Sequence, residues 1–378
     1  MKTLIELRDE IDRIDKEMVR LFEERMLVAE NVAKYKMTIG KAVLDKTREK
    51  EKIENVRSLA HTDFNARGVE ALFSQLMTIS RMRQYMLMAQ ADTDSFGFKC
   101  DTQVITQKTK VVFAGVRGAY GQQAMDGYFG KDIDSFNVTT FKEAMDKVSS
   151  GEAEYGVLPI ENSSTGIITD VYDLLAANNN YIVGVYDVKV EHALLGIPGA
   201  KIEQIKTVYS HAQGLLQCRK FLKDKNWEEI SLANTAIAAK KVVDDKDPSQ
   251  AAIASVLAAK VHGLDILAKE INDIDNNTTR FIIIKNQKHF TPEADKISIC
   301  FEVAHESGTL YNVLSHFIFN GLNMSKIESR PIRGQKFQYR FFVDFEGNLN
   351  DKNVIGAMTG IMSETQNFRI LGNYESID

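Results

Sequence analysis

A group of polar residues stands directly before one strongly apolar run of the chain. The stretch "DNNTTRFIIIK", Asp275 to Lys285, ends in Phe281 to Ile284, which has the composition of a buried strand. Turn chemistry explains the Asp and the two Asn residues, because these favour turns and local backbone hydrogen bonds. It does not explain Thr278, Thr279 and Arg280, which are therefore candidates for a functional site.

Two other polar groups follow apolar runs in the same way. "LPIENSSTG" places Glu161, Asn162 and Ser163 after one expected strand, and "YSHAQGLLQC" places His211 after another. Ligands of α/β proteins usually lie at such strand ends. The alternatives are structural, since Asn162 and Ser163 suit a helix cap or turn and a single histidine often has only a structural role.

The glycines of "VVFAGVRGAYGQQA" are a misleading signal. Gly115, Gly118 and Gly121 have the spacing G-x-x-G-x-x-G rather than G-x-G-x-x-G, and no expected strand ends in a ribose-binding acid ~20 residues later. We therefore expect no nicotinamide cofactor. The three cysteines lack C-x-x-C spacing, so we expect neither a disulfide framework nor a metal site.

The N-terminal helical stretch carries a cation at an apolar position. Apolar residues recur in steps of three and four from Leu4 to Tyr35, as in a coiled-coil seam, and Arg25 occupies one seam position. Lys36 follows eleven residues later and returns to within ~20° of the direction of Arg25. Arg25 either binds an anion or, as the structural alternative, extends to the edge of the seam or pairs with a carboxylate.

Arg8 points ~100° away from Arg25 and lies ~25 Å from it along the helix axis. One small ligand cannot reach both from one helix, so a functional Arg8 would serve a second copy of the chain. The alternative is an ordinary solvated arginine. Further polar residues gather on the following helices: Asp45, Arg48 and Glu49 near the start of a second, and Ser80 and Gln84 at i, i+4 on a third.

These residues must be positioned by three differently built regions. Residues 1–90 are charged, Pro-free and helical, and residues 111–286 alternate strand-like and helical stretches, which predicts an α/β domain with a largely buried sheet. Residues 296–378 read strand, helix, strand, strand, helix, strand, the βαββαβ order of a ferredoxin-like α+β domain. Residues 91–110 and 287–295 lose these patterns, so we expect them to be linkers.

Composition excludes several classes of protein. Of 378 residues, 47 are Lys or Arg and 52 are Asp or Glu, so the formal net charge of -5 gives no basic field for nucleic acid or an anionic membrane. The start of the chain alternates charged and apolar residues, unlike a signal peptide, and no window approaches ~18 uncharged apolar residues. We expect a cytoplasmic protein whose partners are small molecules and other copies of the chain.

The polar residues of the helical region closely resemble those of the all-α chorismate mutase class. The matching positions are Arg8, Arg25, Lys36, Asp45, Arg48, Glu49, Ser80 and Gln84. In that family two chains intertwine, and the first helix lends an arginine to the partner's site. Rearranging chorismate to prephenate needs no nucleophile, only a dianion held in a compact conformation and donors for the ether oxygen. The resemblance implies these contacts: carboxylates with Arg8, Arg25 and Arg48, the ether oxygen with Lys36 and Gln84, and the ring hydroxyl with Glu49.

The stretches "GAYGQQA", "PIENSSTG", "SHAQ" and "NTTRF" together resemble prephenate dehydratase. The resemblance implies two α/β lobes, of the periplasmic-binding-protein kind, with the substrate cleft between them. It implies that Thr279 is the catalytic hydroxyl, with Thr278 as the alternative. Prephenate loses carbon dioxide and hydroxide to become aromatic, so a weak acid that assists departure of the hydroxyl is sufficient. The other residues implied at the cleft are Glu161, Asn162, Ser163, His211 and Arg280.

The last region resembles the ACT regulatory domain of these enzymes. Its phenylalanine-recognition motif is matched by "ESRP", which is Glu328, Ser329, Arg330 and Pro331, and the facing strand–helix turn is matched from Gly308 to Leu314. The resemblance implies feedback inhibition by phenylalanine, with Gly308 permitting close backbone approach and Leu310 supplying an apolar wall. The alternative is a hairpin strand with ordinary surface charges.

Three such patterns in this order resemble the bifunctional chorismate mutase–prephenate dehydratase family. We expect chorismate and prephenate as substrates, phenylalanine as effector, no cofactor, and a homodimer or higher homo-oligomer. One alternative is a monofunctional dehydratase with a decayed mutase segment, which would be expected to have lost Arg25 or Lys36. The other is a non-catalytic ligand sensor, which would not require Thr279.

Overall fold

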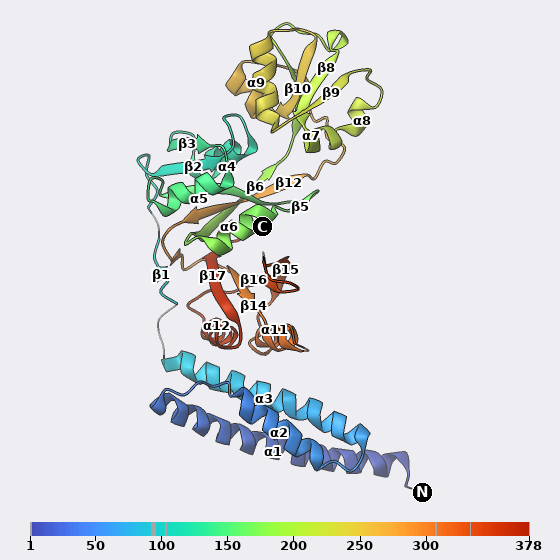
Figure 1. Ribbon diagram of the computed structural model, residues 1–378, viewed down its shortest axis with the longest axis vertical. Coiled ribbons are helices and arrows are strands. Elements are labelled where there is room, and N and C mark those ends of the chain that lie inside the picture. The colour runs from blue at the N-terminus through green and yellow to red at the C-terminus, as the bar shows by residue number, and fades with distance from the viewer. Residues whose placement is uncertain (1, 92–95, 103, 307, 333, 378) are drawn as a thin grey trace. The chain divides into compact units, whose positions relative to one another are not determined.

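The computed structural model of the chain describes residues 2–91, 96–102, 104–306, 308–332 and 334–377 and divides into two compact units (Figure 1). The first unit comprises Met1–Phe98 and Lys296–Ile370, and the second comprises Lys99–Asp295 and Leu371–Asp378. Part of the expected linker 91–110, namely 92–95 and 103, lies outside the described residues. Of the helices in the described ranges, none is long and apolar enough to cross a membrane.

The first unit begins with the helices α1 (Leu4–Ile39), α2 (Lys46–Ser58) and α3 (Asp63–Ala91), which confirms the helical N-terminal region. A capping box of Thr3 and Glu6 starts α1, and Gly40, with φ 65°, ends it in the left-handed conformation. The side chain of Asp45 caps α2 by accepting the backbone N–H of Arg48 at 3.1 Å. The sequence therefore specifies the break at which α1 ends and α2 begins.

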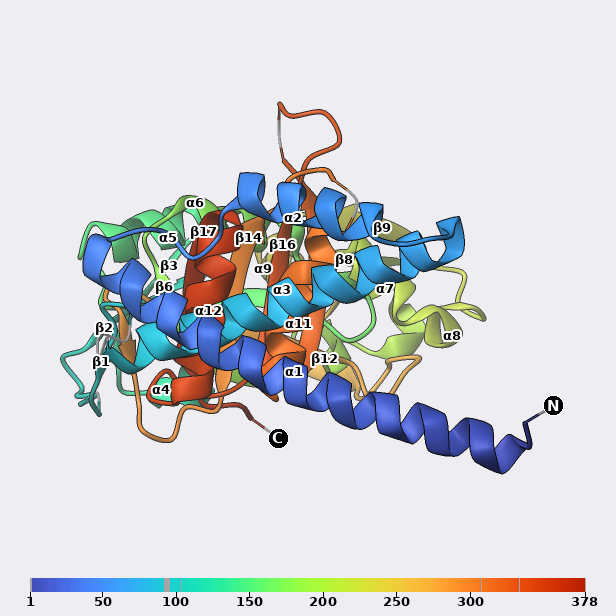
Figure 2. The ribbon, with the colours of Figure 1, turned by 90° about the horizontal axis from the view of Figure 1, so that it is seen from below.

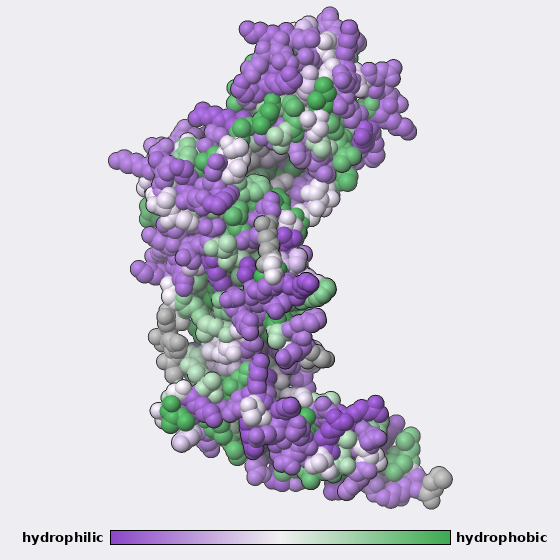
Figure 3. Space-filling view, viewed as in Figure 1, coloured by the Kyte–Doolittle hydropathy of each residue, from purple (hydrophilic) through white to green (hydrophobic). Residues whose placement is uncertain are grey.

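The apolar seam of α1 is exposed over most of its length. Leu7, Ile11 and Ile14 are 44%, 56% and 48% exposed, whereas the buried residues of this helix are Ala29 and Ala33. Figure 2 shows the first half of α1 running away from α3, and in Figure 3 hydrophobic patches lie among hydrophilic side chains near this end of the chain. Over this exposed length, no helix in the described part of the chain covers the coiled-coil-like stripe, which indicates a surface for another helix.

The rest of the first unit has the βαββαβ order expected for the terminal region. Its strands lie in the order β15-β16-β14-β17, the arrangement of the ferredoxin-like fold, with β15 at an edge. Its elements are β14 (Lys296–Glu302), α11 (Thr309–Phe319), β15 (Met324–Pro331), β16 (Tyr339–Glu346), α12 (Lys352–Glu364) and β17 (Gln366–Tyr374).

The second unit consists of two α/β lobes, each with its own sheet. In the first lobe the strand order is β6-β12-β4-β2-β3, and in the second it is β11-β7-β10-β8-β9. The first lobe contains β2 (Lys110–Ala114), α4 (Tyr120–Phe129), β3 (Asp134–Val138), α5 (Phe141–Ser149), β4 (Tyr155–Asn162), β5 (Gly166–Ile167), α6 (Thr169–Ala177), β6 (Tyr181–Lys189) and β12 (Thr278–Lys285). The second contains β7 (His192–Gly196), η1 (Ile202–Gln204), β8 (Thr207–His211), α7 (Ala212–Leu216), α8 (Arg219–Leu222), β9 (Glu228–Leu232), α9 (Thr235–Asp245), β10 (Gln250–Ser255), α10 (Val256–His262) and β11 (Asp265–Ala268). The short strands β1 (Lys99–Cys100) and β13 (His289–Phe290) pair with each other.

Continuous apolar strands are buried on both faces, as the sequence predicts for such sheets. Along β10, Ala252 and Ala254 belong to one core cluster, and Ala251 and Ile253 belong to the cluster on the opposite face. In the first lobe β12 is central and pairs with β4 and β6. This position carries the start of β12 to the edge where the two lobes meet.

The end of β17 belongs to the second unit rather than the first. There Gly372 pairs with Ile182 of β6, and a Cβ atom at Gly372 would overlap the carbonyl oxygen of Ile182. Only glycine fits at so close an approach of two backbones. The pattern of apolar and polar residues in the sequence does not indicate this boundary between the two units, which falls within β17.

Candidate active sites

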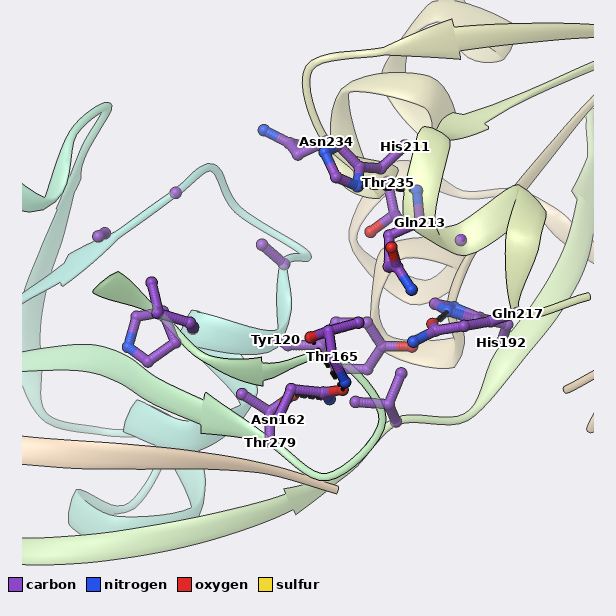
Figure 4. Close-up of a pocket in the computed structure, with 18 of the residues that line it drawn as sticks. Tyr120, Asn162, Thr165, His192, His211, Gln213, Gln217, Asn234, Thr235 and Thr279 are labelled. Carbon is purple, nitrogen blue, oxygen red and sulfur yellow. Dashed lines mark hydrogen bonds between the residues drawn. The ribbon is translucent and has the colours of Figure 1, made fainter. Parts of the chain in front are cut away.

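A pocket of about 330 Å³ in the second unit is lined by both lobes (Figure 4). Thr279, Asn162 and Tyr120 come from the first lobe, and His211 and Gln213 come from the second. The remaining lining residues are Ala114, Gly115, Ala119, Gly121, Pro159, Thr165, Ile168, Val190, His192, Gly214, Gln217, Ala233, Asn234, Thr235 and Phe281. The three polar motifs singled out from the sequence therefore meet at one cavity with the glycine-rich turn.

Strand pairing brings Thr279 and Asn162 together. Their Cα atoms are partners in the ladder between β12 and β4, and Asn162 Nδ2 donates to Thr279 Oγ1 at 2.8 Å. Since successive side chains of a strand point to opposite faces, Thr279 and Phe281 reach the pocket, whereas Thr278 and Arg280 do not. The alternation selects one of the two neighbouring hydroxyls for the pocket.

Asn162 also holds the loop that follows β4. Its Oδ1 accepts the backbone N–H of Ser164 at 3.0 Å and that of Thr165 at 3.1 Å, the pattern of an Asx turn. Its Nδ2 makes a further contact of 2.8 Å with Asn277 Oδ1. The sequence offers a turn-forming role and a functional role for Asn162 as alternatives. In the structure the buried Asn162 side chain both forms the turn and lines the pocket.

A buried histidine extends this hydrogen-bond network across the pocket. His192 is 2% exposed, with its Nδ1 3.0 Å from the hydroxyl of Tyr120 and its Nε2 3.0 Å from Gln217 Oε1. Burial lowers the pKa of His192, which keeps the ring neutral near pH 7. Gln217 Nε2 in turn donates to Ser164 Oγ at 2.8 Å. A chain of hydrogen bonds thus runs from Tyr120 through His192 and Gln217 to Ser164, which lies in the loop that Asn162 holds.

The other residues predicted at the cleft have different surroundings. His211 lines the pocket and caps α7 by accepting the N–H of Gln213 at 3.2 Å. Ser163 fastens the loop instead, since its hydroxyl accepts the N–H of Thr278 at 2.9 Å. Glu161 is not among the residues that line this pocket.

Arg280 makes an ion pair on the strand beside it rather than entering the pocket. Its Nε donates to Asp187 Oδ1 at 2.8 Å and its Nη2 to Asp187 Oδ2 at 2.7 Å, a bidentate pair with the residue opposite it on β6. That hydrogen bond and the charge of Asp187 raise the pKa of Arg280. The structure therefore does not bring Arg280 together with Thr279.

In this pocket the groups available to an anion are uncharged side chains and backbone N–H groups. The lining residues include neither lysine nor arginine. Two helices of ten or more residues start there, α4 behind Ala119 and α9 behind Asn234, and the first turns of both line the pocket. Helix N-termini carry partial positive charge and unpaired N–H groups, so the pocket suits carboxylates.

In the helical region Arg25 is half-buried against α3. Its Nη1 donates to the carbonyl oxygen of Leu76 at 3.1 Å and to the hydroxyl of Ser80. Burial lowers the pKa of Arg25, and its described contacts are to neutral oxygens. None of these described contacts is to a carboxylate that would neutralise the charge of Arg25.

Lys36 and the start of α2 face each other. Lys36 Nζ donates to the carbonyl oxygen of Val43 at 2.6 Å, and burial followed by the charge of Lys41 lowers its pKa. The negative charges of Asp45 and Glu49 act to raise the pKa of Lys36, because both carboxylates lie near it. Backbone capping of Arg48 lowers the pKa of Asp45.

The remaining residues of the helical set vary in exposure. Gln84 is buried, and its Oε1 has no hydrogen-bond partner within the described part of the chain. Arg48 is exposed, and its Nη1 lies 3.7 Å from Glu51 Oε2. Arg8 is exposed on the diverging half of α1, so the structure does not bring it to Arg25 and Lys36 within one chain.

Comparison with known proteins gives the two regions their family. The family model for chorismate mutase type II matches residues 7–85, and the model for prephenate dehydratase matches residues 111–289. The bifunctional chorismate mutase/prephenate dehydratase of Aquifex aeolicus is 31% identical over 375 residues, covering 99% of this chain and 98% of that one. The chain belongs to this bifunctional family.

Solved structures resemble a large part of this family member. A prephenate dehydratase from Arthrobacter aurescens in complex with L-Phe has a TM-score of 0.66 and 29% identity, covering 71% of this chain and 90% of that one. GqqA, described as a novel type of quorum quenching acylase, has the same TM-score and identity and covers 71% of this chain and 98% of that one.

The "ESRP" motif of this family member lies on the edge strand β15. Along β15 exposed and half-buried residues alternate, so Ser329 and Pro331 face outward and Glu328 and Arg330 lie on the other face. Gly308, with φ 83°, starts α11 in the left-handed conformation, and Leu310 lies in its first turn. An edge strand presents unpaired backbone groups that a second copy can meet.

Sequence reasoning missed several polar residues of the two sites. Tyr120 stands within "GAYGQQA" and Asn234 is a helix cap, but neither pattern alone indicates a pocket. Gln217 stands in the quoted stretch "YSHAQGLLQC" without any feature that singles it out, and His192 and Thr235 come from segments with no distinctive motif. Arg81, which contacts Glu49 on α2, is the most consequential omission in the mutase region.

Proposed function

We propose that this chain rearranges chorismate to prephenate in its helical region and converts prephenate to phenylpyruvate in the pocket between its α/β lobes. The observation that carries the proposal is the placement of Thr279 in that pocket, hydrogen-bonded to Asn162, in a chain that also retains Arg25 and Lys36 on α1. The retained cations disfavour a decayed mutase segment. The pocket hydroxyl disfavours a sensor without turnover.

The mutase step requires binding and electrostatic stabilisation alone. Arg25 and Lys36 carry charges that burial disfavours, so a dianion bound between them recovers interaction energy that water no longer supplies. Gln84 contributes an amide donor from the neighbouring helix to the ether oxygen as negative charge develops on it. In this proposal Glu49 accepts the ring hydroxyl, and Arg48 and Arg8 complete the carboxylate contacts.

The dehydratase step requires one proton for the departing hydroxyl. Asn162 donates to Thr279 Oγ1, which makes the threonine hydroxyl a better donor and leaves its own proton to point toward the substrate. As the ring carboxylate leaves as carbon dioxide, the electron pair of the broken C–C bond enters the ring, and the hydroxyl departs with the Thr279 proton as water. Thr279 Oγ1 then takes a proton back from solvent water. The N-termini of α4 and α9 hold the substrate carboxylates in the meantime.

We further propose that two chains pair through α1 to complete each mutase site. The exposed seam of α1 supplies the apolar face, and the exposure of Arg8 frees it to reach a partner's site. Arg8 and Lys36 are 28 residues apart, ~42 Å along one helix, which is too far for a shared small ligand within one chain. The proposed location is the cytoplasm, where cysteines such as Cys100, Cys218 and Cys300 stay as thiols.

Phenylalanine is the proposed effector, bound by the outward face of β15 and the turn at Gly308 where two terminal regions meet. The complex of the Arthrobacter dehydratase with L-Phe supports this proposal. We expect Ser329→Ala to retain turnover but to need about fivefold more phenylalanine for half-inhibition, since one hydrogen bond contributes about 1 kcal/mol. Phenylpyruvate production against phenylalanine concentration is the measurement.

Ser325→Ala is the matched control for that prediction, because Ser325 is exposed on the same face of β15 four residues earlier. Its inhibition curve should overlay the native one. A flat native curve, or equal shifts in both variants, would contradict the proposed effector site. Gly308→Ala is a weaker test, since alanine is strained at φ 83° whatever binds there.

The experiment that tests the proposed function gives purified protein chorismate with no added cofactor. Prephenate should appear first and phenylpyruvate second, and added prephenate alone should yield phenylpyruvate. Turnover of prephenate but not chorismate would support the monofunctional alternative. Binding of either compound without turnover would support the sensor.

A further inference from the structure

A buried chain of ionic contacts in the first unit links Glu49 to the terminal region through Arg81 of α3. Arg81 Nη1 donates to Glu49 Oε1 at 2.5 Å, and its Nε donates to Glu364 Oε1, on α12, at 2.8 Å. The side chains of Arg81 and Glu364 are 6% and 7% exposed. The second oxygen of Glu364 lies 3.4 Å from Nε2 of His316, on α11.

The helices that carry these groups pack closely. A Cβ atom at Gly360 of α12 would overlap the ring of His316 and lie 3.0 Å from the ring of Tyr85, and one at Gly356 would lie 3.2 Å from Met86 Cγ. Glycine at both positions therefore lets α12 approach α3. Because interiors are close-packed, a displacement of α12 must move Glu364 relative to Arg81.

Charge pairing outweighs burial in this chain of contacts. Burial disfavours the charged form of Arg81, but Glu364 and Glu49 together raise its pKa above the ordinary value. Burial likewise opposes ionisation of Glu364, but its contacts with His316 and Arg81 lower its pKa. Removing one partner would leave a buried charge uncompensated, so the side chains of Glu49, Arg81 and Glu364 constrain one another.

We propose that Arg81 is a positioning residue of the mutase site and that Glu364 of the terminal region holds it in place. The inference rests on the proposed mutase function, in which Glu49 binds the ring hydroxyl of chorismate. Arg81 fixes Glu49 through Oε1, which orients the carboxylate so that Oε2 meets the hydroxyl. The mutase site is then built from two segments far apart in the sequence, and the terminal region contributes to substrate binding there.

The test uses the full-length protein and separates positioning from folding through KM and kcat for chorismate. Misplacing Glu49 weakens binding of substrate and transition state alike, which raises KM and leaves kcat near native. A variant that merely folds less well has fewer active molecules, which lowers kcat at unchanged KM. We expect Glu364→Gln to raise KM for chorismate about tenfold, since a hydrogen bond to a charged group contributes about that factor. Arg81→Lys should restore part of the binding that Arg81→Met loses.

Glu302→Gln is the matched control. Glu302 is a buried carboxylate of the same terminal region, and it pairs with Arg340 of that region at 2.6 Å rather than with the helical region. Its KM for chorismate should stay native. The proposal is overturned if Glu364→Gln keeps a native KM, if it loses only kcat, or if Glu302→Gln raises KM equally. A native protein without mutase activity would instead refute the proposed function, so the two failures are distinguishable.

Discussion

Thr279→Ala is expected to lower phenylpyruvate formation from prephenate by about 10²- to 10⁴-fold, the contribution of a positioned general acid. The hydroxyl is held in the pocket by Asn162, and no lysine or arginine lines that pocket to replace it. Because the mutase residues lie in the other unit, the variant should still consume chorismate and accumulate prephenate. Quantifying both products after addition of chorismate is the measurement.

Thr278→Ala is the control with the closest match, since it removes the same group one residue earlier on β12. Its side chain points to the opposite face of the strand, so near-native dehydration is expected. Loss of activity in Thr278→Ala with turnover in Thr279→Ala would identify the neighbouring hydroxyl as the acid instead. Both variants should unfold at temperatures close to the native one, because Asn162 keeps its contact with Asn277.

The features that the sequence predicts well are those with a local physical cause. The seam of α1, the start of α2 near Asp45 and the apolar run after Arg280 each follow from periodicity or turn chemistry within a few residues. The βαββαβ order of the terminal region follows in the same way. Period two along β12 also implies that Arg280 and Thr279 face opposite sides, which a reading by motif alone overlooks.

Long-range pairings have no such local signal. Arg81 stands in "ISRMRQYML" beside two other polar positions, and its partner Glu364 lies 283 positions later in the chain. Likewise, Tyr120 and His192 meet although 72 residues separate them. Periodicity places each side chain on a face, but only the packed fold decides what that face meets.

Arg25→Ala is expected to lower chorismate turnover by about 10²- to 10³-fold, the cost of removing one preorganised charge contact to the transition state. Arg25 is half-buried and its described contacts are neutral, so its charge is available to a substrate carboxylate. Dehydration of added prephenate should be nearly unchanged. Arg20→Ala is the matched control: Arg20 is on the same helix but is exposed and paired with Glu17 and Glu24, so native mutase activity is expected.

Co-expression of Arg8→Ala and Arg25→Ala subunits then tests whether α1 is shared between chains. If each site takes Arg8 from one chain and Arg25 from the other, one site of every hybrid dimer has both native arginines. Random pairing should therefore restore about a quarter of native mutase activity, although each variant alone is nearly inactive. Two different affinity tags allow the hybrid to be purified and its activity compared with both parents. Confirmed hybrids without recovery would contradict the shared site, which the ~42 Å between Arg8 and Lys36 along a straight helix otherwise favours.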